Sequence, residues 1–256
     1  MNKDLKMKTA FTLAEGATHV GILHITRRVG FTLAEVLITL GIIGIVSAMT
    51  IPTLINNYKE KVRDNQFKKV YATLNQALRM TVADFDYVPK CYYPVSGNAL
   101  MSDCKVFLNN FKSKLKIIND CPEKAYEKGC IPDYDGYEVI LKENHKDDPD
   151  YDEQYWENYA NNLGDFKTNK LKTTTPAFVL SDGSVVIIHA YKSYPIFPLF
   201  LIDINGHGGE NKWGYDMFLF AIKYDGKAFR LIGRSHTVNK GGIETILLLR
   251  KLKLYQ

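Results

Sequence analysis

The run from Phe31 to Ile51 is apolar except for Glu35 and a few Thr and Ser residues. About 20 apolar residues span the hydrocarbon layer of a membrane, so this run is long enough to cross one. A secretory signal peptide has a shorter apolar part of about 7 to 15 residues, which ends in a small-residue cleavage site. Here Gly30 and the preceding arginines lie before the run instead. A cut at this glycine would leave the membrane helix on the mature protein.

The residues around this cut form a recognisable motif. Gly30-Phe31-Thr32-Leu33-Ala34-Glu35 resembles the processing motif of type IV prepilins and of the pseudopilins of type II secretion, and Pro52 lies where many of them carry a helix-kinking proline. The resemblance implies that a prepilin peptidase cuts between Gly30 and Phe31 on the cytoplasmic side and methylates the new amine of Phe31. It also implies a single-pass protein of the bacterial inner membrane with an extracytoplasmic head.

Glu35 is an unusual residue for a membrane segment. A charged side chain inside a bilayer costs at least about 2.5 to 3.5 kcal/mol, and such residues usually pair with another charge. The mature helix has no basic residue within reach of Glu35, but cleavage would give Phe31 a cationic amine. The resemblance implies that this amine on one subunit faces the glutamate of a neighbouring pilin or pseudopilin subunit. We therefore expect Glu35 to serve assembly; the alternative is an acid at the headgroup boundary.

Helical periodicity continues beyond the membrane run. Apolar residues recur mostly at steps of three and four from Leu54 to Phe85, with lysines and acids between them. This spacing predicts an amphipathic helix with one face packed on a soluble domain. Because proline lacks an N–H and clashes with the preceding turn, a bend or local melting is expected near Pro52.

Four cysteines follow the helix: Cys91, Cys104, Cys121 and Cys130. An exported domain allows disulfides, and four cysteines permit three connectivities. We prefer pairing between neighbours, Cys91 with Cys104 and Cys121 with Cys130, because both loops are short. A zinc site is the alternative, but the chain has no C-x-x-C pair and no histidine between the first and last cysteine.

The second half of the chain is typical of an antiparallel sheet. Asp182-Gly183 and Asp225-Gly226 each separate two β-rich runs, which is a strong hairpin signal. Another strand is expected in PIFPLFLIDI, where Pro195 and Pro198 confine its start to an edge or a lead-in. The sequence thus predicts about four or five strands packed on the long helix, an α+β fold of pilin type.

The segment from Leu201 to Phe218 is the best candidate for a metal site. Its candidate ligands are Asp203, Asn205, Asn211 and Asp216, whose oxygens suit Ca²⁺. It is not an EF-hand, but it resembles the D-x-N-G…G-x-N-x-x-G-x-D-x-F loop of some pseudopilin-like proteins, in certain of which calcium stabilises the head. The alternative is a glycine-rich strand connection held by Asx-turns.

Other functional classes find little support in the sequence. Asp147, Asp148, Asp150, Asp152 and Glu153 form an acidic cluster of the kind that is usually solvated surface. No G-x-S-x-G, P-loop or H-E-x-x-H motif occurs, so we predict that the protein is not an enzyme. The net charge of +5 is spread along the chain, and this does not indicate a nucleic-acid partner.

The predicted protein is a structural filament subunit of a pilus or secretion pseudopilus. A single-pass, membrane-tethered binding protein that does not polymerise is the alternative. The predicted organisation is a leader (1–30), a transmembrane segment (31–52), an amphipathic helix continuation (53–90), a disulfide-bearing irregular region (91–170), a sheet domain (171–240) and a tail of uncertain structure (241–256).

Overall fold

The computed structural model describes residues 30–85, 102–161, 166–173, 175–189, 199–224, 226 and 228–254. The chain forms two compact units, Met1–Pro52 and Thr53–Gln256. The first unit contains the start of helix α1 (Leu33–Ala83), and the second contains the rest of α1 and the head. Cys91, Pro195 and Pro198, to which the sequence assigns roles, lie outside the described residues.

Helix α1 confirms the helix that the spacing of apolar residues predicts. It is continuous through Pro52, so of the bend or local melting expected there, local melting does not occur. Loss of one backbone N–H at the proline removes a single helical hydrogen bond, and the neighbouring turns keep theirs. Within the described residues, α1 is the one helix long and apolar enough to cross a membrane. Its buried side chains all lie in the second unit: Phe67, Val70, Leu74, Asn75, Ala77, Leu78 and Thr81.

The head contains one antiparallel sheet of six strands in sequential order. These strands are β1 (Ile117–Cys121), β2 (Ala177–Leu180), β3 (Val185–His189), β4 (Leu199–Asp203), β5 (Met217–Tyr224) and β6 (Phe229–Gly233). Five of them come from the predicted sheet region. The sixth, β1, comes from the region expected to be irregular, and its burial is that of an edge strand, largely exposed.

Both predicted hairpins are present. Gly183, between β2 and β3, has φ +88°, and the Asp182 carboxylate accepts hydrogen bonds from the Ser184 N–H and hydroxyl at 3.2 and 2.6 Å. Gly226, between β5 and β6, has φ +95°, a conformation that glycine adopts without steric cost. Asp225 lies outside the described residues.

The remaining helices are short. They are α2 (Ser102–Ser113), α3 (Tyr137–His145), α4 (Glu153–Asn161), α5 (Thr168–Thr173), the 3₁₀ turn η2 (Gly206–Gly208) and α6 (Thr245–Lys251). The segment expected to be irregular therefore contains α2, α3 and α4. The C-terminal tail, whose structure the sequence left open, forms α6.

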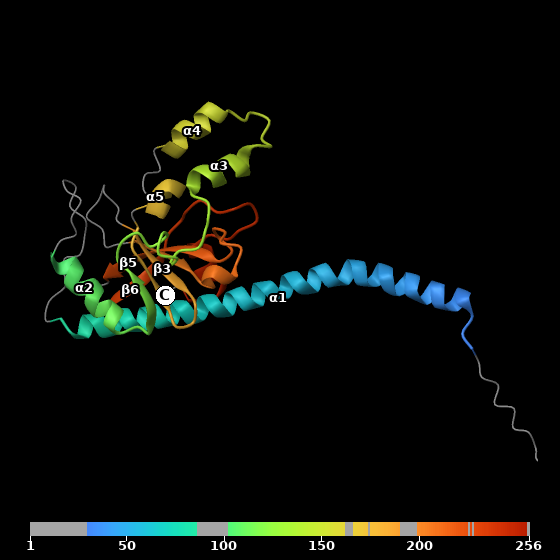
Figure 1. Cartoon of the computed structure of the whole chain (residues 1–256), viewed down its shortest axis with the longest axis horizontal. Helices are drawn as coiled ribbons and strands as arrows, with labels where there is room; N and C mark the ends of the chain where they lie inside the picture. Colours follow the sequence, from blue (N-terminus) through green and yellow to red (C-terminus); the bar gives the residue numbers. More distant parts are fainter. Residues whose placement is uncertain are drawn as a thin grey trace, which may run out of the picture. The chain divides into compact units, whose positions relative to one another are not determined.

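The two faces of the sheet carry separate cores, which explains why β2 to β5 are apolar along most of their length. One core joins alternate strand residues to α1, α2 and α6. The other joins the intervening strand residues to Trp213, Tyr134, Tyr137 and the Cys121–Cys130 disulfide. In Figure 1, the part of α1 that follows Pro52 runs along one side of the sheet, and α3 to α5 lie on the other.

Helix α1 also closes one edge of the sheet. β6 pairs with β5 on one side only. On its other side the Leu231 N–H donates to Asn75 Oδ1 at 2.8 Å, and the Tyr71 hydroxyl donates to the Leu231 carbonyl at 3.3 Å. The Asn75 amide in turn donates to the Tyr71 carbonyl at 2.9 Å. Asn75 is buried, and its side-chain oxygen thus accepts a hydrogen bond from the Leu231 N–H, which would otherwise have no partner in the core.

Replacing Asn75 by Ala is expected to lower the free energy of unfolding by about 1 to 3 kcal/mol, because the buried Leu231 N–H loses its acceptor. Thermal melting of the full chain in detergent measures the change. Asn65→Ala is the matched control, since Asn65 is an exposed asparagine on the same helix and gains the same helix propensity. Equal melting temperatures for the two variants would contradict this role of Asn75.

Candidate functional site

The predicted cleavage site lies immediately before α1. Gly30 and Phe31 have no regular secondary structure, and the Phe31 side chain is 86% exposed. A Cβ added at Gly30 would meet nothing within 4 Å. The peptide bond between them is therefore accessible in the isolated chain.

Thr32 and Glu35 begin α1 with a reciprocal pair of hydrogen bonds. The Thr32 N–H and hydroxyl donate to Glu35 Oε2 at 2.8 and 2.9 Å, and the Glu35 N–H donates to the Thr32 hydroxyl at 3.2 Å. This arrangement is a capping box, which satisfies N–H groups that the first helical turn leaves unpaired. The sequence interpretation missed this role of Glu35, although the T-x-x-E spacing before an apolar run signals it.

The capping box leaves Glu35 able to take a second partner. Both bonds end on Oε2, and among the described residues Oε1 accepts no hydrogen bond. Cleavage after Gly30 would retain both Thr32 and Glu35, so the cap does not depend on the leader. A carboxylate with one committed oxygen and one open oxygen can hold the start of its own helix and also meet a cation.

The four residues of the predicted metal site lie around the connection from β4 to β5. Asp203 Oδ1 accepts the Asn205 and Gly206 N–H groups at 3.1 and 2.7 Å, which is the Asx-turn of the alternative interpretation. Asp216 accepts the Asn211 N–H on Oδ2 at 2.9 Å and the Lys212 N–H on Oδ1 at 2.6 Å. Two carboxylates therefore organise the backbone of this loop.

Gly209 is where the side chains of this loop converge. A Cβ added there would lie 2.3 Å from Asp216 Oδ2 and 2.6 Å from Asn205 Oδ1. Only glycine fits under this pair of side chains. Asn211 adopts φ +52° and donates its amide N–H to the Asp133 carbonyl at 3.1 Å.

Several oxygens of the loop are buried without a hydrogen-bond partner: Asp203 Oδ2, Asn205 Oδ1 and Asn211 Oδ1. Asp203 is fully buried, and its pKa is raised to about 8, first by burial and then by the nearby charge of Asp216. Burial also raises the pKa of Asp216, although its backbone hydrogen bonds oppose this. Unpaired oxygens of carboxylate and amide groups are the ligands that calcium prefers, so the residues present fit this ion.

The described residues contain no group of three or more His, Cys, Asp or Glu side chains that could hold a metal. An ion at this loop would depend on amide oxygens as well as on the two carboxylates. That requirement favours a hard cation over zinc.

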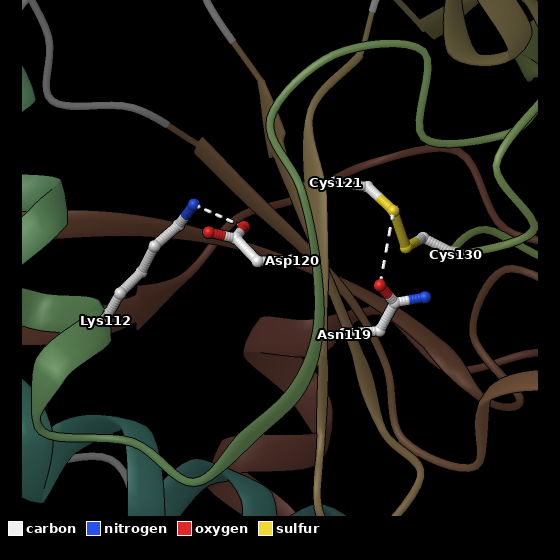
Figure 2. The surroundings of a disulfide bond; sticks show 5 residues. All are labelled: Lys112, Asn119, Asp120, Cys121 and Cys130. Carbon is white, nitrogen blue, oxygen red and sulfur yellow. Dashed lines mark hydrogen bonds and ion pairs between the residues drawn. A yellow bond between two sulfur atoms is a disulfide. The ribbon is translucent and has the colours of Figure 1, made fainter.

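The disulfide between Cys121 and Cys130 is present, as the preferred pairing predicts, with an S–S distance of 2.01 Å (Figure 2). It ties the end of β1 to the following loop. Beside it the Asn119 amide oxygen lies 3.8 Å from Cys121 Sγ, and Lys112 pairs with Asp120 at 2.6 Å. Cys104 is buried and also disulfide-bonded, whereas its predicted partner Cys91 lies outside the described residues.

Comparison with known families identifies the N-terminal segment. Residues 27–51 match the model of the prokaryotic N-terminal methylation motif, which confirms the resemblance to type IV pilin-like proteins. The motif and the fold together define a protein of α+β, pilin-like architecture that prepilin peptidase processes and that the N-terminal helix anchors in a membrane. Proteins with this motif are structural rather than enzymatic. No curated protein and no solved structure matches the chain.

Proposed function

We propose that this protein is a structural subunit of a pilus or of a secretion pseudopilus, assembled in the bacterial inner membrane with its head outside the cytoplasm. The observation that supports this most strongly is the position of Glu35. It is the fifth residue after the scissile bond, at the start of a membrane-length helix, and among the described residues its second carboxylate oxygen accepts no hydrogen bond. Cleavage at the motif would create a cationic amine on Phe31, and this amine on an adjacent subunit would pair with the Glu35 carboxylate.

Assembly through α1 also accounts for the exposed apolar surface of this helix. Large apolar side chains from Phe31 to Ile55 are exposed in the single chain. In the membrane, lipid covers them, and in a filament the α1 helices of other subunits would replace the lipid. Charge pairing then gives the otherwise non-directional contact between apolar helices a defined register.

The state of the mature N-terminus tests this proposal against a non-polymerising tether. We expect the protein isolated from its host to begin at Phe31 and to carry one added methyl group, as measured by intact-mass and peptide mass spectrometry. Gly30→Leu provides an uncleaved control, because it removes the glycine of the processing motif. A Cβ at this position would meet nothing within 4 Å. An intact leader on the native protein would favour the tether, as would a methylated protein that is absent from sheared filament fractions.

We further propose that Ca²⁺ binds the β4–β5 connection, held by Asp203, Asn205, Asn211 and Asp216. The buried, unpaired oxygens of three of these residues support the proposal. A bound cation would pair these oxygens and neutralise two carboxylates that otherwise repel each other in the core. The bound ion would stabilise the head. The effect of calcium on the melting temperature of the full chain tests this proposal.

A further inference from the structure

Helices α3 and α4 carry a group of aromatic rings that neither the filament role nor the calcium site uses. The two helices lie side by side (Figure 1). Trp156 of α4 stacks on the His145 ring of α3, with ring centroids 3.8 Å apart and ring planes 13° apart. Tyr155 and Tyr159 both meet Trp156 edge to face, with centroids 5.2 and 5.9 Å from it. We call these four side chains the aromatic cluster.

The two tyrosines of the aromatic cluster are exposed. Tyr155 is 57% exposed and Tyr159 is 47% exposed, whereas Trp156 and His145 are half-buried. The tyrosines are four residues apart, so they share one face of α4, and their ring planes differ by 18°. Exposed aromatic rings that lie together are typical of surfaces that bind another protein.

The charges around the aromatic cluster are mostly negative. Residues 137–161 contain eight Asp and Glu residues and two Lys residues, which gives a net charge of −6 in a chain whose net charge is +5. Both lysines already pair with acids of the same two helices. Lys142 pairs with Glu153 and Lys146 pairs with Glu143, each at 2.7 Å. An excess of negative charge therefore remains.

Two exposed carboxylates lie next to the rings. His145 Nδ1 donates to Asp148 Oδ2 at 2.7 Å, which places this acid beside the ring that stacks on Trp156. Asp152 Oδ1 accepts the Tyr155 N–H at 3.1 Å, so Asp152 lies one helical turn before this tyrosine. Both acids are exposed. Aromatic faces and carboxylates both attract cations, and the planar guanidinium of arginine can contact the two together.

We propose that the aromatic cluster, together with Asp148 and Asp152, binds a basic segment of another protein through its arginine side chains. An arginine can stack on a tyrosine ring while its N–H groups donate to a carboxylate, and this surface offers both at adjacent positions. The same negative charge repels nucleic acid and anionic lipid headgroups. The proposal depends on the head alone and requires neither filament assembly nor calcium.

Fluorescence anisotropy of a labelled peptide tests this binding. The full chain is held in a non-ionic polyoxyethylene detergent, and the probe is a hexapeptide of alternating glycine and arginine. The matched probe carries citrulline in place of arginine, which keeps the shape of the side chain but removes its charge. We expect the arginine peptide to bind several-fold more tightly at low salt. The difference should shrink at about 0.5 M salt, where the screening length is only about 4 Å.

Tyrosine variants test the contribution of the rings. Tyr155→Leu with Tyr159→Leu keeps apolar side chains of good helix propensity but removes both ring faces. We expect this variant to bind the arginine peptide about fivefold or more weakly, since each exposed cation–π contact contributes roughly a twofold to fivefold factor. Tyr58→Leu is the matched control, because Tyr58 is an exposed tyrosine outside the two helices. It should bind the peptide as the wild-type protein does.

Charge variants test the carboxylates without disturbing the start of α4. Asp148→Asn with Asp152→Asn removes two charges, and asparagine caps a helix as well as aspartate does. The matched control, Glu123→Gln with Glu127→Gln, removes two exposed charges elsewhere on the head. We expect the first pair of changes to weaken binding several-fold and the second pair to leave it unchanged. Unchanged tryptophan emission in each variant shows that Trp156 keeps its surroundings.

Three results would overturn the proposal. The first is equal affinity for the arginine and citrulline peptides at low salt. The second is an equal loss of affinity in the test variants and their matched controls. The third is binding of labelled cellohexaose without binding of the arginine peptide, which would assign the aromatic cluster to a neutral carbohydrate.

Discussion

Glu35→Gln is expected to reduce incorporation into filaments by tenfold or more, while α1 still begins at the same residue. Glutamine can replace glutamate in a capping box, so the variant keeps the helix start. It loses the negative charge that would pair with the Phe31 amine of a neighbour. Hydrogen bonds to charged groups contribute about 1.5 to 3 kcal/mol, which corresponds to roughly a tenfold or larger effect on each subunit added. Quantitative immunoblotting of sheared filaments against the membrane pool measures incorporation.

Thr32→Val is the complementary variant. It removes the hydroxyl that joins the two side chains but keeps the acid and a β-branched shape. Loss of an N-cap costs about 0.5 to 2 kcal/mol of helix stability, which the membrane-embedded remainder of α1 absorbs. We therefore expect Thr32→Val to assemble and Glu35→Gln to fail.

Processing must be measured in both variants, because each change lies next to the scissile bond. Mass spectrometry of the membrane pool shows whether cleavage and methylation at Phe31 still occur. Normal filaments from processed Glu35→Gln, together with loss of filaments from Thr32→Val, would mean that Glu35 acts only as a helix cap. The assembly role proposed for its charge would then be excluded.

Local sequence signals predict much of this fold correctly. The apolar run, the helical spacing after it and the Asp-Gly turns all act over a few residues, and the structure contains the helix and hairpins that they indicate. Cys121 and Cys130 are near neighbours in the sequence, so their pairing could also be predicted from it.

The features that sequence reasoning missed depend on distant partners. β1 is short and includes Asn119 and Asp120, and it becomes a strand only because β2 offers a free edge. Asn75 is an ordinary polar residue until β6 brings the Leu231 N–H to it. The candidate metal residues could be named from their oxygens, but their buried and unpaired state follows from the tertiary packing around them.

In calcium-free buffer, the stability of the head is expected to fall as the pH rises from about 4 to about 8. An unfolded Asp has a pKa of about 3.9, whereas burial and the charge of Asp216 raise the pKa of Asp203 to about 8. Between these values the folded state holds one more proton than the unfolded state. The free energy of unfolding then decreases by up to about 1.4 kcal/mol per pH unit. Below this window the stabilisation is complete, and above it the stabilisation is lost.

Other carboxylates do not reverse this trend, and burial lowers the pKa of His236, which opposes the fall in stability only below the ordinary histidine pKa of about 6.5. Ion pairs or hydrogen bonds lower the pKa values of Glu60, Asp133 and Asp182. Such groups lose their stabilising effect only as the pH falls through their lowered pKa values, below the window in which Asp203 acts. Asp203→Asn, which stays neutral and keeps the shape of the side chain, is expected to melt with a much weaker pH dependence. The test is to compare the melting temperatures of the wild-type protein and of Asp203→Asn, both as the full chain, across this pH range.

Calcium and protons should compete for the same oxygens. A cation requires ionised Asp203, so calcium is expected to raise the melting temperature most near pH 8 and least near pH 5. The pH dependence of the wild-type protein should flatten when calcium saturates the site, and Asp203→Asn should respond little to calcium at any pH. If the melting temperature depends on pH as expected but does not change with calcium, the site does not bind calcium. Asp203 is then a buried, protonated acid within an Asx-turn. In that case the unpaired oxygens of Asn205 and Asn211 would have to be satisfied by water rather than by an ion.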